Sequence, residues 1–236
     1  MQLFTREWGA GDRVAVLVHG LFSSSRTWHR LGPDLAERGY RVVAVDLAGH
    51  GRSPRLESYS IASLVRSIAD TVPLKPELAI GHSLGGLTLS RLIRRLQPGR
   101  AVYIDPAFLG TRLPWWQRAG APMLFRSLLS RGADAVARSN PRWHRDDVEI
   151  EVGDYAAFDR RFLRRFGDGK AMPLTPPDRM AVPSLVMLAD RSRMVSSSVA
   201  DRLRRTGFEV RTVAGAGHTV HRDDFAGFRS ALSGWV

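Results

Sequence analysis

The stretch Glu77-Leu78-Ala79-Ile80-Gly81-His82-Ser83-Leu84-Gly85-Gly86 decides the fold, because it joins a short apolar strand to a helix through a very tight turn. An amphipathic helical pattern continues from residue 87 to residue 96. Gly81 and Gly85 carry no Cβ atoms, so the strand and the helix can approach closely while Ser83 holds strained backbone angles. Alone, this Gly-x-Ser-x-Gly pattern also fits a plain strand-to-helix connection. In this context it predicts that Ser83 presents its hydroxyl outward as a nucleophile.

Three further segments follow the order that a serine nucleophile of this kind requires. Residues 13–20 are an apolar run ending in His-Gly, residues 41–53 are a second strand that breaks into a Gly-rich loop, and residues 210–218 are a third that ends in a histidine. On these motifs the chain resembles the α/β-hydrolase fold family from about Leu3 to its C-terminus, with a less typical middle. The resemblance implies an α/β fold with a mostly parallel central sheet, helices on both faces and a small helical cap. The family's reactions are diverse, so the fold does not choose among them.

Apolar runs alternate with amphipathic stretches, which predicts parallel strands covered by helices on both faces. We expect strands at residues 3–8, 14–18, 41–46, 78–80, 101–104, 184–188 and 209–213. We expect helices at residues 27–38, 61–71, 83–96, 197–206 and 222–233. The alternation fails between Pro106 and about Pro177, where the family carries a helical cap. We therefore divide the chain into a hydrolase core, residues 1–106 and 178–236, and a cap, residues 107–177.

His218 is the predicted general base, because a serine hydroxyl is a poor nucleophile unless a neighbouring imidazole accepts its proton. It follows a strand on the loop Gly215-Ala216-Gly217, and this segment resembles the histidine loop of the family. His221 is a nearby rival, but it falls in a polar turn that we expect to cap the last helix with Asp223 or Asp224.

Two carboxylates compete as the acid that orients His218. In the family the acid usually stands three residues after a glycine that closes the penultimate strand, and Ser192 occupies that position here. A serine supplies no negative charge to stabilise an imidazolium. Asp190 lies two residues earlier, while Asp105 ends the preceding strand, from which some α/β-hydrolases take their acid. Neighbouring strand ends lie roughly 5 Å apart, so either carboxylate can reach the imidazole. We favour Asp105 and keep Asp190 as the alternative.

Two backbone N–H groups are expected to stabilise the oxyanion that forms when Ser83 attacks. Leu84 lies at the N-terminus of the expected helix 83–96, where backbone N–H groups are free to donate. The resemblance implies that the second donor is the N–H of Leu21, directly after His19-Gly20.

Aromatic residues are candidates for an apolar acyl pocket. Phe22 and Trp28 are expected to border its mouth. The cap, which by resemblance lies above the nucleophile, contributes Trp115, Trp116, Trp143, Phe158 and Phe162. Each of these residues also fits a simpler role in holding a small helical insertion together.

Composition limits the partners. The formal net charge is +12, but 33 of the 35 basic residues are arginines spread through every segment, so no nucleic-acid partner is predicted. Attraction to anionic substrates or acidic surfaces stays open. The absence of cysteine excludes disulfides and cysteine-based metal sites. No apolar run reaches the roughly 18 to 20 residues of a membrane span, and the first residues lack the apolar centre of a secretory signal. We therefore expect a cytoplasmic protein without a membrane span, and an exported form that has lost its leader is the alternative.

These parts predict a serine hydrolase that cleaves a carboxylic ester, or a related acyl bond, of a small or medium apolar substrate through an acyl-enzyme. No metal or organic cofactor is required. A serine nucleophile argues against the dehalogenase and epoxide hydrolase reactions that the family performs with an aspartate. Thioesterase, lactonase, carbon–carbon hydrolase, acyltransferase and cofactor-free haloperoxidase chemistry stay open, as does a non-catalytic ligand-binding protein on the same fold. The partner predicted is a small-molecule acyl substrate, and no oligomeric state is predicted.

Overall fold

One mostly parallel sheet organises the chain. The computed structural model describes residues 1–109, 115–163 and 174–236, and within them seven strands lie in the order β1-β3-β2-β4-β5-β6-β7. The strands are β1 (Thr5–Trp8), β2 (Arg13–Val18), β3 (Tyr40–Val45), β4 (Leu78–His82), β5 (Arg100–Ile104), β6 (Ser184–Ala189) and β7 (Glu209–Val213). β1 pairs antiparallel with β3, and the other pairings are parallel. The predicted fold class is confirmed.

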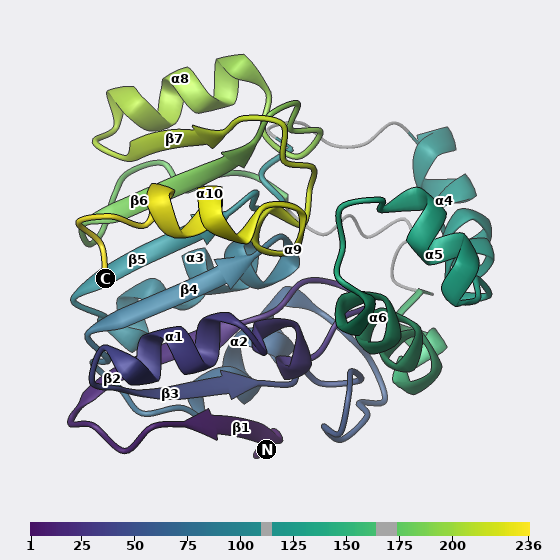
Figure 1. The fold of residues 1–236 in the computed structure, drawn as a ribbon, viewed down its shortest axis with the longest axis horizontal. Helices are drawn as coiled ribbons and strands as arrows, with labels where there is room; N and C mark the ends of the chain where they lie inside the picture. Colours follow the sequence, from purple (N-terminus) through teal and green to yellow (C-terminus); the bar gives the residue numbers. More distant parts are fainter. Residues whose placement is uncertain (110–114, 164–173) are drawn as a thin grey trace.

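Helices cover both faces of this sheet, as Figure 1 shows. One face carries α1 (Leu31–Glu37) and α10 (Phe225–Ala231), and the other carries α2 (Ile61–Ala69), α3 (Leu84–Leu96) and α8 (Ser197–Arg205). The alternation of side chains along β2 explains the two layers: Leu17 packs into the first core, while Val16 and Val18 pack into the second. Because β2 is buried on both faces, its sequence reads as one apolar run.

The chain between β5 and β6 forms a separate group of helices. They are α4 (Trp115–Leu129), α5 (Ala133–Ser139), α6 (Arg145–Ala157) and the short 3-10 helix η2 (Arg160–Leu163). Figure 1 shows them beyond the carboxyl ends of the central strands, the edge at which open α/β sheets bind ligands. We call these elements the cap. The division of the chain at residues 107 and 177 stays a prediction.

All seven predicted strands are present with bounds close to those expected, but two predicted helices are each broken in two. Residues 27–38 contain the end of the 3-10 helix η1 (Ser25–Trp28) and then α1, while residues 222–233 contain the end of α9 (Val220–Asp223) and then α10. The second break falls at Asp224, whose side chain accepts the N–H of Gly227 at 2.9 Å and so begins α10 as a new helix.

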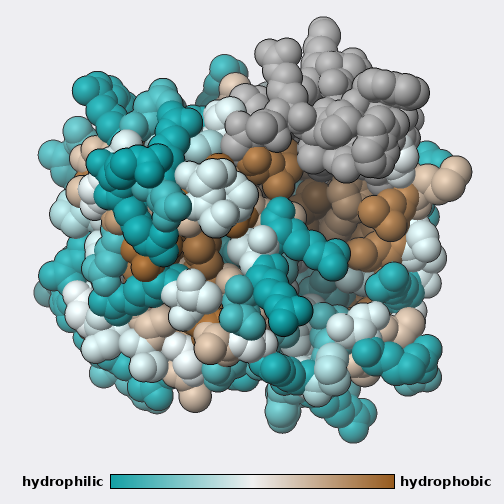
Figure 2. All heavy atoms as spheres, turned by 90° about the horizontal axis from the view of Figure 1, so that it is seen from above, coloured by the Kyte–Doolittle hydropathy of each residue, from teal (hydrophilic) through white to brown (hydrophobic). Residues whose placement is uncertain are grey.

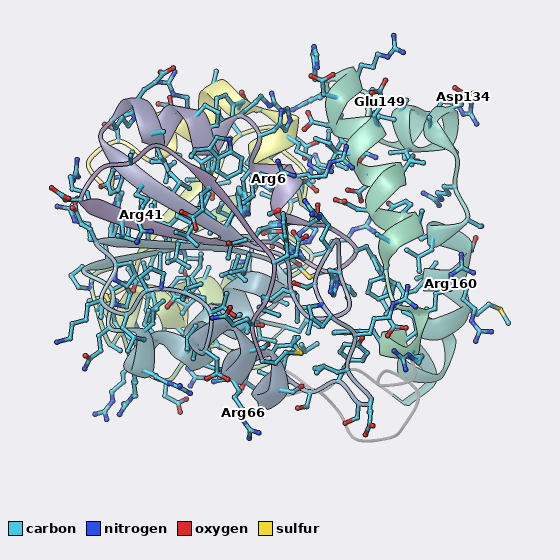
Figure 3. All side chains as sticks on the ribbon, turned by 90° about the horizontal axis from the view of Figure 1, so that it is seen from below. Arg6, Arg41, Arg66, Asp134, Glu149 and Arg160 are labelled. Carbon is cyan, nitrogen blue, oxygen red and sulfur yellow. The ribbon has the colours of Figure 1, made fainter. Side chains whose placement is uncertain are left out.

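The surface is polar without one dominant patch. Figure 2 shows hydrophilic residues over most of one face, with smaller hydrophobic areas between them. Figure 3 shows Arg41 and Arg66 on the core and Arg160 on the cap, which illustrates how widely the arginines are spread. Across the described parts of the chain, no helix combines the length and apolarity needed to cross a bilayer.

Candidate active site

Ser83 sits on a strained turn between β4 and α3. Its φ of +51° and ψ of −115° are unusual for a residue with a side chain. The turn is tight: a Cβ at Gly85 would lie 2.3 Å from the carbonyl oxygen of Val18. Hydrogen bonds from the N–H of Ser83 to the carbonyl of Ile104, and from the N–H of Ala107 to the carbonyl of Ser83, both 3.0 Å, hold this backbone in place.

The structure brings Ser83, His218 and Asp105 into one hydrogen-bonded chain. His218 Nε2 lies 3.0 Å from Ser83 Oγ, and His218 Nδ1 lies 2.6 Å from Asp105 Oδ2. With the carboxylate as acceptor, Nδ1 carries the proton and Nε2 is free to accept the proton of the serine hydroxyl. The arrangement has the geometry of a nucleophile, a general base and an orienting acid.

Of the two candidate acids, only Asp105 contacts the imidazole. Asp105 follows β5 with a φ of +35°, is fully buried, and accepts the N–H of Ala189 through its second oxygen at 3.3 Å. Asp190 is exposed, and its own N–H donates to the carbonyl of Ala216. Ser192, at the usual family position, accepts the backbone N–H groups of Met194 and Val195 through its hydroxyl. The carboxylate that contacts His218 therefore follows β5, the strand next to β6.

The backbone around Leu84 and Leu21 bears on their predicted role as oxyanion donors. Leu84 is the first residue of α3, where the N–H has no carbonyl one turn earlier in the helix to bind. For Leu21 the geometry is set by His19. Its Nε2 accepts the N–H of Leu47 at 2.9 Å, so its Nδ1 carries the proton and donates to the carbonyl of Gly20 at 2.7 Å. In a trans peptide the C=O and N–H point in opposite directions, so this bond turns the N–H of Leu21 away from His19.

Buried neutral imidazoles surround the chain of three residues. Burial lowers the pKa of His19 to about 4, and burial together with nearby positive charge holds the pKa values of His82 and His221 well below their usual range. Nε2 of His82 donates to the backbone carbonyl of His218 at 3.0 Å. His82 thus fixes the backbone of the predicted base.

Phe22 and Trp28, both predicted to border the pocket mouth, lie in different places in the structure. Phe22 directly follows Leu21 and has a φ of +66°. Its ring makes edge-to-face contacts with Phe125, Tyr155 and Phe158 of the cap. Trp28 does not border a pocket mouth as expected. It is fully buried in the core on the α1 face of the sheet, where its ring stacks on His221 at 4.6 Å.

Of the tryptophans expected to line the pocket from the cap, only the side chain of Trp143 is described by the structure. Trp143 is half-buried, and its Nε1 donates to Asp223 in α9 at 2.9 Å. The side chains of Trp115 and Trp116 lie outside the described part of the structure. Phe162 packs against Tyr59 and His50, on the core side of the cap.

Sequence reasoning missed a buried ionic cluster at the junction of the cap and the core. Arg222, in α9, is buried with Glu151 and Asp147 of α6. His29, which had no apparent context in the sequence, binds Asp147 through Nε2 at 2.9 Å. The sequence signal is the four-residue spacing of Asp147 and Glu151, which places these two acids on one face of α6. Among the described residues, no group of three or more His, Asp or Glu side chains is placed to hold a metal ion.

Comparison with known proteins identifies the family. The family model for the alpha/beta hydrolase family matches residues 15–231. The chain belongs to this family. The chain is 32% identical over 146 residues to a pimeloyl-[acyl-carrier protein] methyl ester esterase of Methylococcus capsulatus, covering 58% of this chain and 55% of that protein. It is 29% identical over 229 residues to a candidate protein-lysine deacylase of Rattus norvegicus, covering 94% and 84% of the two chains.

The solved structures agree on the fold. An N-formylmaleamic acid deformylase from Pseudomonas putida superposes with a TM-score of 0.78 at 19% identity, covering 97% of this chain and 94% of that chain. The first curated relatives are matched over only part of their length, between 37% and 55%.

Proposed function

We propose that this protein is a serine hydrolase that cleaves carboxylic esters through an acyl-enzyme. The observation that carries the proposal is the continuous chain of hydrogen bonds from Ser83 through His218 to buried Asp105, over 3.0 and 2.6 Å. An imidazole so oriented can take the serine proton during attack and return it to the leaving alcohol.

The reaction follows in two halves. His218 accepts the proton of Ser83 as its oxygen attacks the acyl carbon, and the N–H groups of Leu21 and Leu84 donate to the resulting oxyanion. The oxyanion collapses, the C–O bond to the alcohol breaks, and His218 protonates the leaving oxygen. Water then attacks the acyl-enzyme, with His218 again as base, and releases the carboxylic acid and free Ser83.

An apolar acyl group is the best fit for the substrate. Phe22 directly follows the proposed donor Leu21, and its ring meets Phe125 at 5.1 Å and Phe158 at 4.8 Å between ring centroids. These rings form an apolar cluster next in sequence to the proposed donor, which suits an apolar acyl group. The names of related proteins include methyl ester esterase and lipase, in agreement with an ester substrate.

Turnover of p-nitrophenyl acetate and butyrate tests the proposal. We expect the wild-type protein to hydrolyse both esters, and Ser83→Ala to abolish turnover while Ser130→Ala, an exposed serine at the end of α4, leaves it unchanged. Thioester and lactone substrates in the same assay rank the acyl bonds. Equal turnover by wild type and Ser83→Ala contradicts the proposal, and ligand binding without turnover favours a binding protein.

A further inference from the structure

Arg222 is a buried arginine that the proposed reaction does not use. It lies four residues after His218, in the short helix α9, and only 1% of its side chain is exposed. Its Nε donates to Thr27 Oγ1 at 3.0 Å, and its Nη1 donates to Glu151 Oε2 at 2.5 Å. One guanidinium therefore joins α9 to η1 of the core and to α6 of the cap. A planar fork of donors suits such a junction, because it binds two partners in fixed directions.

The neighbours of Arg222 in α9 bind the same surroundings. His221 Nε2 lies 2.9 Å from Thr27 Oγ1, so the hydroxyl of Thr27 is shared by two consecutive residues of α9. Asp223 accepts Trp143 Nε1 at 2.9 Å, and the guanidinium of Arg222 stacks over the Trp143 ring at 4.8 Å. Each residue from 221 to 223 thus contacts η1 or the cap.

Two carboxylates on one face of α6, those of Asp147 and Glu151, face Arg222. Asp147 is fully buried and binds Arg30 at 2.7 Å, and the Glu151 side chain is 14% exposed, on the same side of the helix. Glu149 lies on the outer side of α6, as Figure 3 shows, and pairs with Arg145 at the surface. The inward acids are therefore a specific feature of the face that meets Arg222.

The contacts of α9 with η1 and α6 are linked to the predicted base, His218, through packed histidine rings. The ring of His221 lies 5.0 Å from that of His82, and the ring of His82 lies 4.8 Å from that of His218. His82 also donates to the backbone carbonyl of His218. A shift of α9 is transmitted to His218 both along the chain and through these packed rings.

We propose that Arg222 is a positioning residue, which holds α9 against η1 and α6 and thereby keeps the His218 imidazole within proton-transfer reach of Ser83. This inference rests on the proposed function. Small errors in the placement of a catalytic group cost rate far more than binding. Loosening the junction should therefore lower kcat and leave KM nearly unchanged.

Thr27 gives the sharpest test, because its hydroxyl can be removed with little change in volume. We expect Thr27→Val to lower kcat for p-nitrophenyl butyrate on the order of 10-fold, with KM within about twofold of wild type. Thr27→Ser keeps the hydroxyl and should stay within about threefold of wild type. The rate of Ser83 labelling by a fluorophosphonate should fall in parallel with kcat, since it depends on the same base.

A second pair of variants tests the contact with the cap. Glu151→Gln removes the charge facing Arg222, and Glu149→Gln makes the same change on the outer side of α6. We expect the first to lower kcat by roughly fivefold and the second to have no effect. Arg222→Met leaves buried acids unpaired and is expected to fold poorly. Arg222→Lys, which keeps the charge, should fold, and its kcat should lie between those of wild type and Thr27→Val.

The outcomes separate the two proposals. If wild type neither hydrolyses the ester nor reacts with the fluorophosphonate, the proposed function fails and the role of Arg222 fails with it. If wild type is active and Ser83→Ala is not, but Thr27→Val and Glu151→Gln keep wild-type kcat per folded molecule, only the positioning role is overturned. A rise in KM with unchanged kcat also overturns it, because Arg222 would then serve the cap alone.

Discussion

Asp105 Oδ2 lies 2.6 Å from Nδ1 of His218, although Asp105 directly follows β5 and not β6, the strand beside the one that leads to His218. The loop after β6 supports this arrangement through its backbone. Ala189 donates its N–H to Asp105, and Asp190 donates its N–H to the carbonyl of Ala216 in the histidine loop. The carboxylate that binds His218 therefore follows β5, while the backbone N–H groups that support it and the histidine loop belong to the end of β6.

Replacing the two aspartates separately should give very different results. Asp105→Asn is expected to lower kcat by about 10³- to 10⁴-fold, because an amide keeps the shape but no longer holds Nδ1 as the protonated nitrogen. Asp190→Asn is expected to keep kcat within about twofold, since its side chain is exposed. Steady-state turnover of p-nitrophenyl butyrate measures both, and similar losses in the two variants contradict the assignment.

His19 should matter for kcat although it does not touch the nucleophile. His19→Ala removes the bond that turns the Gly20–Leu21 peptide, and loss of one oxyanion donor costs on the order of 10²-fold in kcat. The control variant is His144→Ala, which replaces an exposed histidine at the start of α6. Fluorescence-monitored urea unfolding checks that both variants fold. Wild-type kcat in a folded His19→Ala protein argues against Leu21 as a donor.

Asp154 should make stability depend on pH. It is buried on α6, binds the hydroxyl of Ser24 at 2.8 Å through Oδ1, and its Oδ2 has no hydrogen-bond partner among the described residues. Burial raises its pKa to about 7. Because the folded state holds this proton more tightly than the unfolded state does, ionising Asp154 lowers the free energy of unfolding. This penalty is absent below about pH 4, grows as the pH rises to about 7, and is then constant.

Asp154→Asn removes this penalty while keeping an acceptor for Ser24. We expect the variant to gain on the order of 2 kcal/mol in unfolding free energy over wild type at pH 8, and little at pH 4. Urea denaturation at both pH values measures the difference. Asp146→Asn, an exposed change on the same helix, is the control. A gain that does not change with pH shows that Asp154 is not protonated by burial.

The tight turn after Ser83 should not tolerate a methyl group. Gly85→Ala places a Cβ against the backbone carbonyl of Val18 and is expected to destabilise the fold by roughly 2 kcal/mol or more. Gly120→Ala, in α4 with nothing within 4 Å of the new Cβ, is expected to change stability by less than about 1 kcal/mol, toward stabilisation. Thermal unfolding of the two variants compares them directly.

The sheet, and the meeting of Ser83, His218 and Asp105, could be predicted because local rules govern them. Strands buried on both faces appear as continuous apolar runs, and the turn around Ser83 demands glycines at fixed positions. Parallel strands bring their carboxyl ends to one edge, so residues far apart in the sequence, such as Asp105 and His218, could be expected to meet. Asp224, one of the two aspartates expected to cap the last helix, does so, but the helix expected from residue 222 begins only at Phe225.

The surroundings of Ser83, His218 and Asp105 could not be predicted in the same way. Trp28 was expected at a pocket mouth, but one aromatic residue in a short turn carries no pattern that tells which way it points. Arg222 lies in a charged segment that resembles a solvated turn, and its partner Glu151 is 71 residues away. Such contacts depend on how the cap packs onto the core, which the local pattern does not encode.

Fluorophosphonate labelling followed by peptide mass spectrometry tests the central claim most directly. The account predicts a single adduct on the peptide that contains Ser83, absent in Ser83→Ala and formed far more slowly in His218→Ala. Labelling of a different serine, or equal labelling rates in wild type and His218→Ala, would contradict it.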